Sequence, residues 1–99
     1  MSGRGGAGGP TAGKARRVEA VIRAATAHAA GTHGLTRRES DVIRCVLRGL
    51  DTRAIASELG CGTKTVETHV TSLLRKTGTS GRLELAARAW LAWALATQG

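Results

Sequence analysis

Residues 51–76, DTRAIASELGCGTKTVETHVTSLLRK, carry the clearest structural pattern of this chain. It begins with Asp51, a good helix N-cap, which is followed by apolar residues at helical spacing: Ile55, Ala56 and Leu59. Two glycines, Gly60 and Gly62, then predict a tight turn, and a longer helix is expected from Thr63 to Lys76. A short helix, a glycine turn and a second helix form the helix-turn-helix arrangement.

The helix expected at Thr63–Lys76 has one apolar side and one polar side. At about 100° per residue, four apolar residues gather on one side: Val66, Val70, Leu73 and Leu74. The opposite side carries mostly short polar side chains, with Glu67 at its margin: Lys64, Thr68, Thr71, Ser72 and Arg75. Short side chains let a helix lie deep in a DNA groove, where hydroxyl groups reach base edges or phosphates. An ordinary solvated helix face is the alternative, and the helix-turn-helix context favours contact with DNA.

Two further helices flank this unit. Thr36 and Glu39 have the spacing of a capping box, so a helix is expected to begin at Thr36 and to end near Gly49. Its apolar face comprises Val42, Ile43, Val46, Leu47 and Leu50. A last helix, from about Gly81 to Thr97, is expected after a cap at Thr79 or Ser80.

The last helix carries two apolar stripes on different flanks. One stripe comprises Leu83, Ala87, Trp90 and Ala94, and the other comprises Leu85, Ala89 and Trp93. Because a domain of this size can cover only one stripe, we expect a subunit interface at the second: Leu85, Ala89 and Trp93. The alternative is a helix that lies in a groove of its own domain with Trp93 half exposed.

The N-terminal third has a different composition. Residues 1–17 are Gly-rich and contain no acidic residue, and we expect them to form a disordered tail. Its four basic residues, Arg4, Lys14, Arg16 and Arg17, make it either a basic arm that contacts phosphates or a solvated leader. Within residues 18–34, the sequence VEAVIRAATAHAA (18–30) predicts a short amphipathic helix. That helix could pack on the following domain, pack on a second subunit, or belong to a linker.

Composition narrows the classes of function. The 99 residues are enough for one domain, and a formal net charge of +8 suits a polyanionic partner. With two Trp and no Phe or Tyr, the core must be aliphatic, which suits packed helices better than a sheet. The lack of aromatic residues also argues against proteins that bind single strands by stacking bases on aromatic rings. The spacing of Cys45, Cys61 and the three histidines matches no metal-ligand pair, and no apolar run approaches about 18 residues. We therefore expect a cytoplasmic protein with no membrane segment and no disulfide.

An ordered set of fragments carries a family resemblance: LTRRE (35–39), GL (49–50), IASEL (55–59), TVETHV (65–70), LLRKTG (73–78), and Arg82 with Leu85. With these fragments, the run from Leu35 to about Trp90 closely resembles the LuxR-type (GerE-type) helix-turn-helix domain. The resemblance implies an all-α, four-helix domain within residues 35–99, with the third helix in the major groove and the fourth at a dimer contact. The chain adds an extra N-terminal helix and a disordered basic tail.

The resemblance also implies roles for single residues. Base readout falls on Glu67, Thr68 and Thr71, and phosphate contacts are expected from Lys64, Thr65, Ser72, Arg75 and Lys76. His69 matches a family histidine and is interpreted as a packing residue, not a catalyst. The family usually has Ser or Thr at Gly62 and often Lys at Glu67. We hypothesise that the Glu67 carboxylate accepts a hydrogen bond from a cytosine amino group and reads a C·G pair.

The sequence thus predicts a DNA-binding transcriptional regulator with no catalytic site, metal or cofactor. The expected partners are double-stranded DNA, a second copy of the chain and RNA polymerase, without a membrane or a small-molecule ligand. A helical adaptor that binds another protein without touching DNA is the alternative. Because about 34 residues before Leu35 are too few for a sensory domain, we expect either a stand-alone regulator or a fragment.

Overall fold

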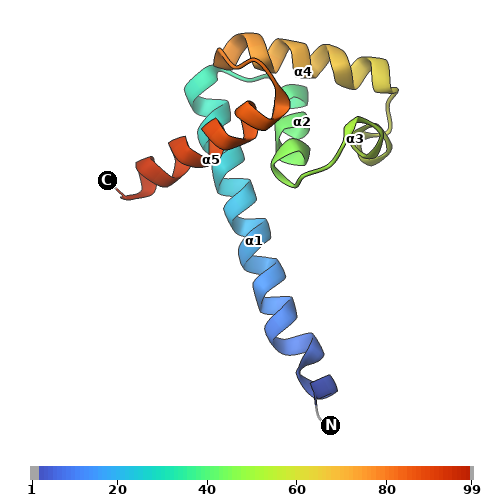
Figure 1. Ribbon diagram of the computed structural model, residues 1–99, viewed down its shortest axis with the longest axis vertical. Helices are drawn as coiled ribbons and strands as arrows, with labels where there is room; N and C mark the ends of the chain where they lie inside the picture. The colour runs from blue at the N-terminus through green and yellow to red at the C-terminus, as the bar shows by residue number, and fades with distance from the viewer. Residues whose placement is uncertain (1–2, 99) are drawn as a thin grey trace.

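The computed structural model describes residues 3–98, with the surroundings of the side chains described from residue 13. Five helices make up this part of the chain: α1 Gly3–His33, α2 Arg37–Leu47, α3 Thr52–Leu59, α4 Thr63–Thr77 and α5 Arg82–Gln98. No strand occurs among the described residues, so the all-α prediction is confirmed. Figure 1 shows α4 lying across one end of the bundle, while α1 runs away from it as a long rod.

The starts of α2 and α3 are fixed by side-chain caps. The Glu39 amide donates to the Thr36 hydroxyl at 3.1 Å, and the Thr36 amide donates to the Glu39 carboxylate at 2.9 Å, which completes the predicted capping box. Asp51 accepts from the Ala54 amide at 2.8 Å and caps α3. At the end of α3, Gly60 has φ +67°, a left-handed conformation that side chains other than glycine rarely adopt.

The core lies where α2, α3, α4 and α5 meet. Its largest fully buried side chains are aliphatic: Val42, Ile43, Ile55, Val66, Leu73 and Leu85. They occupy the apolar faces that the helical periodicity predicts for all four helices. The burial of these branched side chains supplies most of the stabilisation of this small domain.

The N-terminal helix belongs to the same core. Ile22, Ala25 and Ala29 of α1 are buried, and α1 packs against both α2 and α5. The small alanine side chains let the helix backbones approach closely, and Arg44 of α2 forms an ion pair with Glu19 of α1 at 3.1 Å. Of the three arrangements left open by the sequence, packing on the following domain is the one that the structure adopts.

The helix also extends further toward the N-terminus than predicted. The sequence predicts a helix from residue 18 and a disordered tail before it, whereas α1 begins at Gly3, and residues 1–2 lie outside the described part. The side chains of residues 14–18 are exposed, so tertiary packing does not order this segment. Once residues 21–33 form a packed helix, its extension toward the N-terminus needs no new nucleation, which favours added turns although Pro10 cannot donate a backbone hydrogen bond.

The interface predicted on α5 needs a correction. Leu85 and Ala89 are 1% and 8% exposed, and Trp93 is partly buried against the same core, so this stripe is covered within the chain. The helices α1, α2 and α4 all contact α5 and together cover this stripe. The stripe left open comprises Leu83, Ala87, Leu91 and Leu95, whose three leucines are 85%, 58% and 61% exposed.

Candidate nucleic-acid interface

One face of α4 is held tightly by the rest of the domain. Val66 and Leu73 are fully buried, and Val70 and Leu74 pack partly buried beside them. The helix rests on both α2 and α3, and Figure 1 shows it along the outer edge of the bundle. A helix anchored in this way presents its other face to solvent in a fixed orientation.

The outward face of α4 carries the residues to which the sequence assigns base readout. Glu67, Thr68 and Thr71 are all exposed. The Thr68 hydroxyl donates to the backbone carbonyl of Lys64 at 3.1 Å, so in this arrangement its oxygen is left to accept hydrogen bonds. Glu67 has no ion-pair partner within the described part of the chain. The structure brings the three side chains to one surface, and their role in reading bases stays a prediction.

Three of the residues predicted to contact phosphate also lie on this surface. Lys64, Thr65 and Arg75 are exposed, the first two in the first turn of α4 and the third near its end. The N-cap of α4 is Gly62, which makes no side-chain cap bond, as expected from the departure noted in the sequence. The first backbone N–H groups of α4 therefore have no side-chain partner at this cap.

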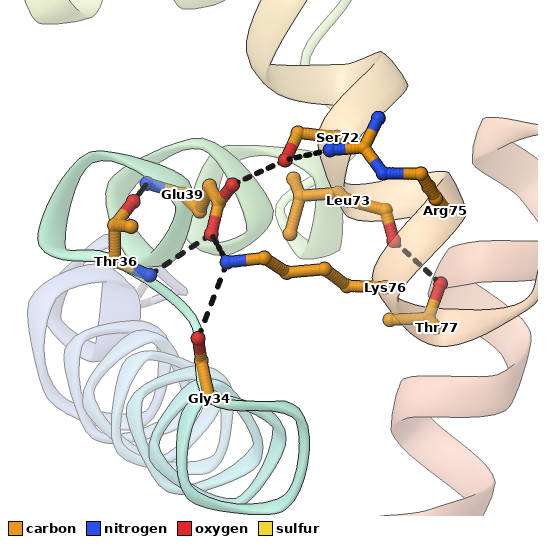
Figure 2. A network of polar contacts seen from close by, with 8 residues as sticks. All are labelled: Gly34, Thr36, Glu39, Ser72, Leu73, Arg75, Lys76 and Thr77. Atoms are coloured by element: carbon orange, nitrogen blue, oxygen red, sulfur yellow. Dashed lines mark hydrogen bonds and ion pairs between the residues drawn. The ribbon is translucent and has the colours of Figure 1, made fainter.

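The other two predicted phosphate contacts, the partly buried Ser72 and the exposed Lys76, form bonds within the domain. A carboxylate oxygen of Glu39 accepts from Lys76 Nζ at 2.8 Å and from the Thr36 amide, and its other oxygen accepts from the Ser72 hydroxyl. Lys76 Nζ also donates to the carbonyl of Gly34 at 3.3 Å (Figure 2). Ser72 and Lys76 thus hold α4 against α2 and the end of α1, and their contact with phosphate stays a prediction.

The Glu39 side chain is buried and ionised at the centre of these contacts. It is 4% exposed, and its pKa is lowered to about 2. The largest cause is the hydrogen bond from Lys76, followed by those from Ser72 and the Thr36 amide, which together outweigh the effect of burial. A buried carboxylate with this many donors acts as a fixed anchor for the helices around it.

The sequence alone did not reveal this second role of Glu39. The capping box explains why Glu39 stands at the third position of α2, and that local role fully accounts for the residue. Its contacts to Ser72 and Lys76 join residues 33 and 37 positions apart. The one available signal was a lysine near the end of a helix, two residues after an apolar pair at 73–74, which is too common to be informative.

The two cysteines of the described part of the chain form no disulfide. Cys45 and Cys61 are both free thiols, and burial raises the pKa of the Cys45 thiol, which keeps it protonated. His69 is partly buried beside the outward face of α4. Across the described residues, no group of three or more potential ligands could hold a metal ion. The described helices also include none that is long and apolar enough to cross a membrane.

Taken together, α3, the turn at Gly60 to Gly62, and α4 form a helix-turn-helix unit, with α4 in the place of the recognition helix. Comparison with known proteins defines the family. The model of the bacterial regulatory proteins of the luxR family (GerE) matches residues 33–89, so the chain belongs to this family. The resemblance noted in the sequence is confirmed, and membership of a family of regulatory proteins agrees with the prediction that the chain is not an enzyme.

Several curated regulators share this region. The transcriptional regulatory protein UhpA of Salmonella typhimurium is 42% identical over 59 residues, which cover 60% of this chain and 30% of that protein. A putative HTH-type transcriptional regulator of Aeromonas salmonicida is 41% identical over 68 residues, 69% of this chain and 34% of its own length. The transcriptional regulatory protein YdfI of Bacillus subtilis is 38% identical over 50 residues, 50% of this chain and 24% of that protein.

The chain thus spans about a third of the length of the first of these relatives, and the similarity lies in the helix-turn-helix region. No solved structure matches the chain significantly.

Replacement of Glu39 by glutamine tests the anchor. Because the pKa of Glu39 is about 2 in the folded chain against an ordinary 4.5, its stabilisation is complete above about pH 4.5 and is lost as the pH falls toward 2. We expect Glu39→Gln to lower the free energy of unfolding at pH 7 by on the order of 2 kcal/mol. The difference from the unmodified chain should shrink between pH 4.5 and 2, as measured by urea denaturation.

Glu58→Gln is the matched control for this experiment. Glu58 forms an exposed ion pair with Arg48 at 3.5 Å, so its replacement should cost less than about 1 kcal/mol at any pH. Equal stability of Glu39→Gln and the unmodified chain at pH 7, or a difference that does not change with pH, would contradict the anchor role.

Proposed function

We propose that this chain binds double-stranded DNA by placing α4 in the major groove and that it regulates transcription in this way. The observation that carries the proposal is the contrast between the two faces of α4. Val66 and Leu73 are fully buried, while Glu67, Thr68 and Thr71 are exposed. A recognition helix needs both properties, since its apolar face must be fixed to the domain and its polar face must be accessible to DNA. Membership of the luxR family and the names of the relatives as transcriptional regulators support the proposal.

Electrostatics supports the same orientation. The exposed cations Lys64 and Arg75 lie near opposite ends of α4, where they can flank a groove and contact its two phosphate backbones. The backbone amides of the first turn of α4, which follow the Gly62 N-cap, add hydrogen-bond donors at the positive end of the helix dipole. These groups supply affinity that does not depend on base sequence, and the polar side chains between them supply the discrimination.

Within this proposal, Glu67 has a defined chemical role. Its carboxylate is exposed, has no ion-pair partner among the described residues, and can only accept hydrogen bonds when ionised. The cytosine amino group is a hydrogen-bond donor that a C·G pair offers in the major groove. An acid on the groove face is repelled by phosphates, so it lowers general affinity while it favours a site with cytosine opposite it.

We also propose that the chain forms a homodimer through the open stripe of α5. This stripe replaces the one predicted from the sequence and comprises Leu83, Ala87, Leu91 and Leu95. Three exposed leucines and one alanine at four-residue intervals form an apolar patch of the kind that marks association. A two-fold dimer would present two copies of α4 to half-sites about one helical turn apart. A regulator of this kind would also contact RNA polymerase, through a surface that DNA leaves open.

The salt dependence of DNA binding tests the main proposal. With a duplex selected from random sequences, we expect the affinity to fall at least about tenfold between 50 and 200 mM salt. Lys64→Ala should weaken binding and lower the slope of log affinity against log salt by about 1. Arg23→Ala removes the same charge from an exposed site on α1 and should leave the slope unchanged. Absence of salt-sensitive binding to any duplex would favour the adaptor function instead.

Selection of binding sites tests the role of Glu67. The unmodified chain should select sites with a preferred C·G pair at one position, and Glu67→Ala should lose about 1–3 kcal/mol of discrimination there. Glu58→Ala, on α3, is the control and should select the unmodified site. If Glu67→Ala selects the same sites with the same preference, Glu67 does not read this base pair.

Sedimentation velocity tests the dimer. Leu91→Glu places a charge in the centre of the proposed interface and should shift the chain to a monomer, with the dimer dissociation constant raised at least about tenfold. Val18→Glu is the control, because Val18 is similarly exposed at 54% but lies on α1. A purely monomeric unmodified chain, or equal effects of both substitutions, would refute this interface.

A further inference from the structure

The Ser72 hydroxyl lies between a buried carboxylate and an exposed guanidinium. Its oxygen is hydrogen-bonded to Glu39 Oε2 on one side, and Arg75 Nη2 lies 3.5 Å from it on the other. Figure 2 shows these three side chains in a row from the interior of the domain to the outer surface of α4. Ser72 and Arg75 are one helical turn apart, so this geometry follows directly from their spacing on α4.

The donor and acceptor of each hydrogen bond between Glu39, Ser72 and Arg75 can be assigned. Glu39 is ionised, and its two oxygens accept hydrogen bonds from the Thr36 amide, Lys76 and Ser72. A serine hydroxyl has a single proton, and here that proton is donated to Glu39. The outer side of the Ser72 oxygen can therefore only accept. Because ionised phosphate oxygens also only accept, Ser72 cannot donate to a DNA phosphate while it is bound to Glu39.

We propose that Ser72 is a positioning residue, which accepts from the Arg75 guanidinium and orients it toward a DNA phosphate. The inference rests on the proposed function, since it assigns a task to a residue of the same surface. An exposed arginine samples many rotamers, and fixing one of them on binding costs conformational entropy. The bond to the Glu39 carboxylate polarises the Ser72 hydroxyl and makes its oxygen a better acceptor for a cation. The buried anchor is thereby connected to the DNA-contacting surface.

Two simpler roles for Ser72 make different predictions. If Ser72 contacted phosphate directly, its effect on DNA affinity would add to that of Arg75. If Ser72 only tied α4 to α2, its removal would lower the melting temperature and leave the affinity and salt dependence of the folded protein unchanged. A double-mutant cycle between Ser72 and Arg75 therefore separates these roles from the proposed one.

The cycle uses the full chain and a duplex selected by the unmodified protein. We expect Ser72→Ala to weaken binding about threefold to tenfold and to reduce the salt slope toward that of Arg75→Ala. In the Arg75→Ala background, Ser72→Ala should have no further effect on affinity. Ser72→Thr keeps the hydroxyl and should restore binding close to that of the unmodified chain. If Ser72→Ala does not fold, Ser72→Cys takes its place, because a thiol is a weak donor and a weak acceptor.

Each result bears on the inference alone or on the proposed function. Additive effects of the two substitutions, or an unchanged affinity and salt slope in folded Ser72→Ala, would overturn the positioning role while DNA binding stands. Failure of the unmodified chain to bind any duplex in a salt-sensitive manner would refute the proposed function itself. Full coupling, with restoration by threonine, supports the inference.

Discussion

The hydrogen bonds that the buried Glu39 carboxylate accepts fix the arrangement of the helices in this domain. Removing an ionised carboxylate from water is unfavourable unless hydrogen-bond donors replace the lost hydration. Here the donors come from the start of α2 and from two residues of α4, so the carboxylate is satisfied only when the two helices have this relative position. Among the described residues, no buried side-chain polar atom lacks a partner. The orientation of α4 is thus coupled to the ionisation of one side chain.

The same contacts connect the N-terminal helix to the recognition helix. Lys76 reaches both Glu39 and the carbonyl of Gly34, which follows the last residue of α1. Meanwhile Ile22, Ala25 and Ala29 of α1 complete the core against α5. The extra helix is therefore a structural part of the domain, and it covers part of the surface of α5.

Local signals explain which features could be predicted from the sequence. The capping box at Thr36, the cap at Asp51 and the glycine after α3 act through residues four or fewer positions apart, and all of them appear in the structure. Features that depend on distant contacts could not be predicted in this way. The sequence shows that α5 has two apolar stripes, but only the packing of α5 against α1, α2 and α4 determines that Leu85 and Ala89 are the buried ones. In the same way, a helical wheel places Ser72 among the exposed polar residues of α4, and its bond to Glu39 cannot be predicted from that position.

Nuclear magnetic resonance can show whether the outward face of α4 enters a DNA groove. Backbone amide shifts would be followed as a selected duplex is added to the isotope-labelled chain. If α4 enters the groove, the largest changes fall on residues 63–75 of α4, with small changes in α1 and along the leucine stripe of α5. Large changes confined to α1 and α5, with α4 unaffected by the duplex, would contradict it.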